Sequence, residues 1–410
     1  MTNTDGDNTS FIRKLRQESE LWLSEGIIDS RQRDAIMARY REAAEPGGAV
    51  IQSQLIFTLS ILGALLLGAG LILFFSANWS AIPKWGKISL IFAGMLSSYG
   101  TGYYLGFEKG NYPRVGASLV LLGSIIFGAG IFLTAQAYNV SSHSAAGILM
   151  WGAGILPVAY ALRLKPVLVL SIVTMLGWLF VEVVYGLYSP SGNFDLMPFL
   201  LLGAGLTLWG IGLMHEEFDS LRPLSSPYVV AGLPLTFLAT YVFTFSGASR
   251  VSIAVLELPE VRLILIVMGS IIVLSQALRF FATRRPTKTQ LIHESLLMLL
   301  MIVFAAAQLI YSHFVHIRAI SVLLYNLIYA AAILWIIYIG YLKHMRVYVN
   351  MGVLFFALDV IGRYVDILWG MLHTSLFFVL GGALLIALGV ALEKKRRRLL
   401  AAMGSLDYAD

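Results

Sequence analysis

ASLVLLGSIIFGAGIFLTAQAY, residues 117–138, runs without a single charged side chain. A helix needs about 20 apolar residues to cross the hydrocarbon core of a bilayer, so this stretch predicts a membrane-spanning helix. The whole chain agrees, since 58% of its 410 residues are hydrophobic, only 13% are charged and the mean hydropathy is +0.79. A soluble fold cannot remove so much apolar surface from water. The composition therefore predicts an all-α, polytopic transmembrane helix bundle.

Similar apolar runs recur on both sides of this stretch, and together they predict about twelve spans. These are 54–75, 88–107, 117–138, 144–162, 166–188, 196–214, 227–246, 261–281, 291–312, 319–342, 347–367 and 373–392. The bundle is expected over residues 51–393, between a cytoplasmic helical hairpin with its linker (1–50) and a basic cytoplasmic tail (394–410).

The lysines and arginines test the topology, because cytoplasmic loops carry an excess of them. With the N-terminus in the cytoplasm, twelve spans place most of the 29 on the cytoplasmic side, Arg279 and Lys343 among them. Both termini are therefore predicted to be cytoplasmic. The first fifty residues lack the pattern of a cleavable signal peptide, so we expect the first span to act as the insertion signal.

One segment, residues 11–40, has the pattern of water-soluble helices. Gly26 suits a helix C-terminus, and Asp29 with Gln32 has the form of a capping box that opens a second helix. Two such short helices bury too little to be stable alone. We expect the hairpin to pack on the protein's own loops or a second copy, or to bind a cytoplasmic protein, or to be disordered. The residues predicted to make such a contact are Trp22, Ile28, Ile36 and Tyr40.

Three motifs indicate a family. The first is W-L-x-E-G-I-I-D-x-x-Q-x-x-x-I-x-x-x-Y, from Trp22 to Tyr40; the others are SANWSAIPKWGK (76–87) and FGAGIFLTAQAYNV (127–140). Together they resemble a family of prokaryotic multi-pass membrane proteins known as domain of unknown function 2157, over roughly residues 11–160. The resemblance implies a bacterial inner (cytoplasmic) membrane location. It brings no activity and no catalytic residues.

The SANWSAIPKWGK stretch follows the first span and falls on the outer side of the predicted topology. Trp79 and Trp85 suit the headgroup level of the bilayer, and Lys84 and Lys87 are placed to reach lipid phosphates. The stretch is interpreted as part of an aromatic belt, with a lid over an outer cavity as the alternative.

Few polar side chains fall inside the predicted spans. Those noted are Gln136, Glu182, Gln276, Gln308, Asn326, Asp359 and Arg363. Glu182 is the best candidate for proton coupling, because a carboxylate inside hydrocarbon is costly and must be paired, protonated or directed into the bundle. The alternative is a carboxyl group hydrogen-bonded near the outer interface. Gln136 and Gln308, which end the third and ninth spans, either reflect an internal repeat of two six-helix halves or form interhelical hydrogen bonds.

The stretch DVIGRYVD (359–366) places three charges inside the eleventh span. Arg363 follows Asp359 by four residues and precedes Asp366 by three, so the three side chains share one helix face. One interpretation is a local ion pair that reduces the cost of insertion. The other is a polar cavity in the outer half of the membrane, used by a solute or a proton and shared with Glu182.

The residues that several kinds of catalysis or ligand binding require are absent from the sequence. There is no cysteine, and the sequence contains none of the hydrolase or nucleotide-binding motifs considered. No catalytic residue, cofactor, metal or nucleic-acid partner is predicted, and the lipid bilayer is the expected surrounding. Three functions remain open, of which one is an unrecognised membrane enzyme that acts on a lipid or a lipid-linked substrate. The other two are a proton-linked carrier of a small or apolar solute or lipid, and a non-catalytic scaffold or sensor that acts through the N-terminal hairpin.

Overall fold

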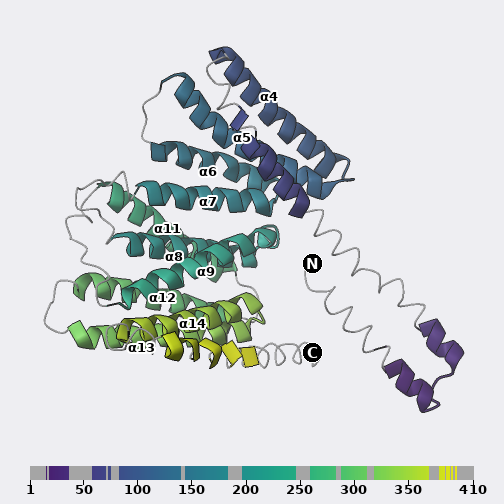
Figure 1. The fold of residues 1–410 in the computed structure, drawn as a ribbon, viewed down its shortest axis with the longest axis vertical. Helices are drawn as coiled ribbons and strands as arrows, with labels where there is room; N and C mark the ends of the chain where they lie inside the picture. The colour runs from purple at the N-terminus through teal and green to yellow at the C-terminus, as the bar shows by residue number, and fades with distance from the viewer. Residues whose placement is uncertain are drawn as a thin grey trace. The chain divides into compact units, whose positions relative to one another are not determined.

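A computed structural model describes residue 15 and residues 18–36, 58–70, 73–74, 83–139, 144–182, 196–245, 259–282, 288–311, 318–368, 378–383, 385–387, 389–390 and 393–394. Every regular element within these ranges is helical (Figure 1). The chain divides into two units, Met1–Ser141 and Ser142–Asp410.

Seven helices in the described part of the chain are long and apolar enough to cross a membrane. They are Pro113–Ala137, Met197–Glu217, Arg222–Phe243, Val261–Ala282, Thr289–Leu309, Leu323–Leu342 and Arg346–Asp366. Shorter apolar helices cover Thr58–Gly70, Ala145–Ala161, Lys165–Val181 and Phe378–Ala387. The prediction of a multi-helix membrane protein is confirmed in this coarser form. The count of twelve spans stays a prediction.

The first unit joins the helix Thr58–Gly70 to α4 (Lys84–Tyr103) and α5 (Pro113–Ala137). A π-helical turn, η2 (Tyr104–Glu108), extends α4. Ala64, Ile91, Leu122 and Ile126 form the buried cluster that joins the three helices. Close approach of α4 and α5 depends on glycine, since a Cβ at Gly102 would lie 2.9 Å from the carbonyl oxygen of Gly116.

The N-terminal hairpin has the caps that its sequence predicts. The backbone N–H of Asp29 donates to Oε1 of Gln32 at 2.9 Å, and the N–H of Gln32 donates to Oδ1 of Asp29 at 2.6 Å, which confirms the capping box. Gly26 has a φ of 72° and ends the first helix, and the N–H of Ile27 donates to the carbonyl of Trp22. This bond belongs to the Schellman motif, which satisfies the last carbonyls of a helix.

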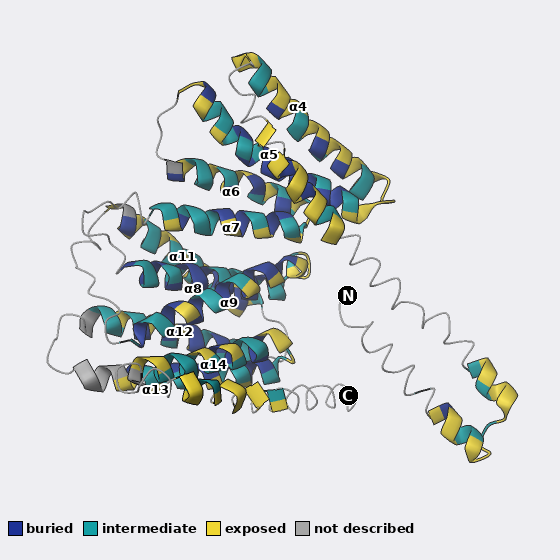
Figure 2. Ribbon diagram, in the orientation of Figure 1, coloured by how far each residue is buried: buried dark blue, intermediate teal, exposed yellow. Residues whose placement is uncertain are grey.

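The second unit is built largely of helix hairpins. Its elements are α6 (Ser144–Ala161), α7 (Lys165–Val181), α8 (Met197–Glu217), the 3₁₀ turn η5 (Arg222–Leu224), α9 (Ser225–Phe243), α11 (Pro259–Ala282), α12 (Lys288–Tyr311), α13 (Arg318–Leu342) and α14 (Arg346–Leu368). Helix α8 contacts α9 and α11, while α9 contacts α12, α13 and α14. Helices α8 and α9 are therefore central, and Figure 2 shows them rich in buried residues.

Two hairpins of the second unit turn in the same way. Residues 162–164 join α6 to α7, and residues 343–345 join α13 to α14. Arg163 and His344 take left-handed φ angles of 52° and 54° at the middle of these turns, and each turn has the paired hydrogen bonds of a Schellman motif. Such short connections keep the two helices of each hairpin antiparallel neighbours.

Candidate functional site: a buried ionic network

One end of the second unit brings together three helix hairpins, α8/α9, α11/α12 and α13/α14. Glu216 is near the end of α8, Arg279 is in the last turn of α11, and Glu294 is in the second turn of α12. Lys343 directly follows α13, and Tyr348 is in the first turn of α14. Because antiparallel hairpins place these positions at the same ends of their helices, the five side chains converge.

Glu294 is the centre of this network. Its Oε2 lies 2.5 Å from Nη2 of Arg279, and its Oε1 lies 2.7 Å from Nζ of Lys343. The ammonium of Lys343 also contacts Oε2 of Glu216 at 2.6 Å. The side chains of Arg279 and Glu294 are only 2% and 1% exposed. Two carboxylates and two cations therefore balance in a place almost closed to solvent.

Neutral side chains complete the hydrogen bonding around the charges. Gln276 accepts from Nη1 of Arg279 at 3.1 Å and from the hydroxyl of Ser295 at 3.0 Å. The hydroxyl of Tyr348 donates to Glu294 at 3.4 Å and accepts from the indole N–H of Trp209 at 3.2 Å. These contacts anchor the network to the apolar core, of which Trp209 and Tyr348 are fully buried members.

Lys343 lies just outside the apolar span Leu323–Leu342. Burial alone lowers the pKa of its ammonium, but the neighbouring Tyr348, Glu294 and Glu216 outweigh that effect, so the pKa lies above its ordinary value. The lysine is therefore charged at neutral pH. Taking such ions out of water costs several kcal/mol each, roughly, and only good pairing compensates for that cost.

A second polar cluster surrounds Arg363 on α14. Its guanidinium contacts Asp359 at 3.5 Å and Asp366 at 3.3 Å, as their spacing predicts, and it donates to the hydroxyl of Thr244 at the end of α9. The guanidinium also lies 4.1 Å from the ring centroid of Phe245. The ion pair within α14 is thus present, and it additionally ties α14 to α9.

A third cluster joins α6, α8 and α9. Nδ1 of His215 lies 2.6 Å from the carbonyl oxygen of Ile211, so Nδ1 carries the proton and donates it. Nε2 is then the acceptor for the hydroxyl of Tyr160 at 2.9 Å. The hydroxyl of Tyr228 donates to Tyr160 at 2.8 Å. The three side chains form a directed chain of hydrogen bonds that ends one residue before Glu216.

The residues predicted from sequence are distributed over both units. Gln136 is exposed near the end of α5, and Gln308 is half-buried in α12. Glu182 is half-buried and follows the last residue of α7. A cavity shared by Glu182 and Asp359 stays a prediction, as does the internal repeat.

The residues predicted for partner binding lie on the hairpin. Trp22, Ile28 and Ile36 are half-buried there, and Tyr40 lies outside the described residues. Their role in binding stays a prediction.

The ionic network could not be recognised from the sequence patterns considered above. Glu294 falls inside the predicted span 291–312 and was not counted among the polar residues of the spans, although a lone carboxylate in the run KTQLIHESLLMLL was a usable signal. In the sequence, Arg279 and Lys343 have the pattern of positive charges that flank spans. Their pairing depends on contacts between helices that are distant in sequence.

Comparison with known proteins finds a match for one part of the chain only. No curated protein and no solved structure matches the chain. One family model matches a segment that includes residues 20–40 of the hairpin, the SANWSAIPKWGK stretch, α4, α5 and α6, and that ends before the residues of the ionic network. Residues 20–168 match the model of the family described as predicted membrane protein (DUF2157), the family that the three motifs resemble.

Proposed function

We propose that the protein is a proton-linked carrier of a small or apolar solute or lipid in the bacterial inner membrane, with both termini in the cytoplasm. The observation that carries this proposal is the pairing of Glu294 with Arg279 and Lys343 at a place almost closed to solvent. An ionisable side chain within a membrane helix is costly to insert, and such residues commonly mark ion or proton paths.

The network supplies a mechanism for coupling. A protonated Glu294 is neutral and no longer balances Arg279 and Lys343, so proton binding weakens both ion pairs. These pairs hold the ends of three hairpins together. Proton binding at Glu294 thus favours separation of the hairpins at this end, which is the kind of rigid-body change by which carriers alternate access.

The cluster around Arg363 provides polar side chains near the other end of α14, away from the ionic network. Tyr348 of the network and Arg363 stand about 22 Å apart along α14 at 1.5 Å per residue. That distance covers most of a hydrocarbon core of about 30 Å. Asp366 is 43% exposed, whereas Glu294 is 1% exposed, so this second cluster is the more open one. Asp359, Arg363, Glu182, Gln136 and Gln308 are the proposed proton- or solute-binding residues.

The test is a proton flux into proteoliposomes that contain a pH-sensitive dye, driven by an inward proton gradient. We expect the wild type to acidify the lumen faster than empty liposomes do. The double variant Arg279→Gln/Glu294→Gln and the single variant Asp359→Asn should lose this flux. The double variant removes one cation and one anion together, so the pairing of Lys343 with Glu216 is retained.

The matched control is Asp219→Asn, which neutralises an exposed carboxylate three residues from Glu216 and should conduct like the wild type. Each variant is first checked for helical content and monodispersity. A wild type as slow as empty liposomes contradicts proton coupling. Equal flux in the wild type and the double variant would show that proton transport does not depend on the ionic network.

A scaffold or sensor function is the second candidate, and the N-terminal hairpin favours it. Leu21 and Ile27 are 51% and 64% exposed there, beside the half-buried Trp22, Ile28 and Ile36. An ordered hairpin with exposed apolar side chains suits a protein partner or a second copy. Deletion of residues 1–45 distinguishes the two functions, because it should remove a cellular phenotype of a scaffold and leave the proteoliposome flux of a carrier unchanged.

A further inference from the structure

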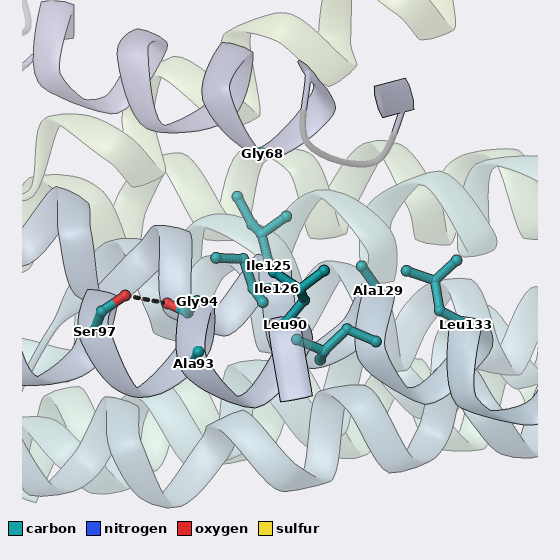
Figure 3. A pocket seen from close by; sticks show the side chains of 10 residues that line it. Gly68, Leu90, Ala93, Gly94, Ser97, Ile125, Ile126, Ala129 and Leu133 are labelled. Atoms are coloured by element: carbon teal, nitrogen blue, oxygen red, sulfur yellow. Dashed lines mark hydrogen bonds between the residues drawn. The ribbon is translucent and has the colours of Figure 1, made fainter. Parts of the chain in front are cut away.

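The first unit contains an apolar cavity of about 380 Å³ between the helix Thr58–Gly70, α4 and α5 (Figure 3). Its volume lies within the range of about 300–1,000 Å³ typical of small-molecule sites. Its lining includes Gly68, Leu90, Ala93, Gly94, Ser97 and Leu133. The whole lining belongs to the segment that matches the family model.

Among the described residues, the side chains that line the cavity are almost all apolar. Ser97 supplies its one hydroxyl group, and that hydroxyl donates to the carbonyl oxygen of Gly94 on the preceding turn at 3.0 Å (Figure 3). An apolar cavity without convergent polar groups suits an apolar ligand better than water. The occupant should therefore be a hydrocarbon.

The cavity is an elongated groove that runs along the helices. From Leu90 to Ser97 the rise along α4 is about 10 Å. Small residues on all three helices make the space, and a Cβ built on Gly94 would meet only Cδ1 of Ile126, at an ordinary 3.8 Å. A flexible chain of methylene groups fits such a groove, because each methylene removed from water contributes favourably.

Positive charge stands at one end of this groove. Lys84 and Lys87 are in the first turn of α4, with Trp85 77% exposed between them. The ammonium of Lys84 lies 5.6 Å from the ring centroid of Tyr138, so the start of α4 meets the end of α5. Leu90 begins the groove within one turn of Lys87. Lysine and tryptophan in this arrangement suit the headgroup level of a bilayer.

From this combination we infer that the groove binds one acyl chain of an anionic phospholipid, whose phosphate contacts Lys84 and Lys87. The apolar lining favours the hydrocarbon of an acyl chain, and the two lysines favour a headgroup with negative charge. The groove lies within the first unit and the ionic network lies within the second, so variants of one leave the residues of the other unchanged.

The experiment is native mass spectrometry of the detergent-purified full chain, titrated with dioleoyl phosphatidylglycerol or dioleoyl phosphatidylcholine. We expect saturable binding of one phosphatidylglycerol, tighter than that of phosphatidylcholine. Gly94→Phe fills the groove and should weaken that binding at least tenfold. Gly100→Phe is the matched control, since Gly100 is on the same helix, outside the groove, with open space around its Cβ position, and it should bind like the wild type.

The headgroup is tested with Lys84→Gln/Lys87→Gln, which should lose about fivefold in affinity for phosphatidylglycerol per lysine and leave phosphatidylcholine unchanged. Should Gly94→Phe fail to fold, Ala93→Phe fills the same groove from an exposed position. Wild-type affinity in a folded groove-filling variant overturns the site. Equal affinity of the wild type for the two lipids overturns the assignment of the lysines.

Discussion

Nη2 of Arg279 lies 2.5 Å from Oε2 of Glu294, although the two residues belong to different helices and are almost fully buried. Lys343 contacts the other oxygen of the same carboxylate and continues to Glu216. One carboxylate thereby links α12 to α11 and to the turn between α13 and α14, and Lys343 extends the link to α8.

The first prediction concerns Glu294. Glu294→Gln leaves the buried Arg279 and Lys343 without their shared anion, so we expect the free energy of unfolding to fall by about 3–5 kcal/mol. Arg279→Gln should cost a similar amount. The double variant should be more stable than the sum of the two single losses predicts, because it removes both members of a pair.

Reversible unfolding in mixed micelles measures all three variants against Asp219→Asn, an exposed change expected within about 0.5 kcal/mol of the wild type. Strict additivity of the two single losses would show that the two charges do not interact.

The second prediction concerns pH. The pKa of Lys343 is raised in the folded protein, so the folded state holds this proton more tightly than the unfolded chain does. The resulting stabilisation is complete below the unfolded pKa of about 10.4 and is lost as pH rises above it.

Lys343→Met should therefore lower stability at neutral pH and flatten the decline above about pH 10.4, by up to about 1.4 kcal/mol per pH unit. The difference between the unfolding curves of wild type and variant isolates this lysine from the other titrating groups. Parallel curves throughout the alkaline range contradict the raised pKa.

Contacts between residues that are close in sequence could be predicted, whereas contacts between residues that are distant in sequence could not. The capping box of Asp29 and Gln32 and the ion pairs of Arg363 are contacts three or four residues apart, and helix geometry specifies them. Arg279 and Glu294 are separated by 15 residues, and Lys343 and Glu216 by 127. Such pairs depend on which hairpins pack next to one another. The spans have similar apolar compositions, so their sequences do not indicate which of them become neighbours.

The apolar groove was hidden for a different reason. Leu90, Gly94 and Leu133 are unremarkable in a membrane helix, and a cavity arises only from how three helices pack. Lys84 and Lys87 were recognised as candidates for lipid phosphates because charge next to tryptophan is a local pattern. The structure adds the groove beside them.

The third prediction tests the link between α9 and α14. Thr244 accepts a hydrogen bond from Arg363, so Thr244→Val should cost about 1.5–3 kcal/mol of unfolding free energy, the range for hydrogen bonds to charged groups. Thr207→Val is the control, since the hydroxyl of Thr207 donates to Gly203 in its own helix, and its loss should be smaller. Equal losses in the two variants would mean that the Arg363 contact contributes nothing beyond the helix itself.

The last prediction concerns the N-terminal hairpin. Asp29→Ala removes the side-chain acceptor at the start of the second helix, and losing such a cap costs about 1 kcal/mol. Local opening of residues 30–36 should become about fivefold more frequent, which hydrogen exchange of the full chain measures directly. Asp34→Asn is the control, because Asp34 is exposed and pairs only with its neighbour Arg33 among the contacts described, and exposed pairs contribute little. Unchanged exchange in Asp29→Ala would mean that a contact elsewhere, rather than the cap, holds the hairpin, which is the result a bound partner or a second copy would produce.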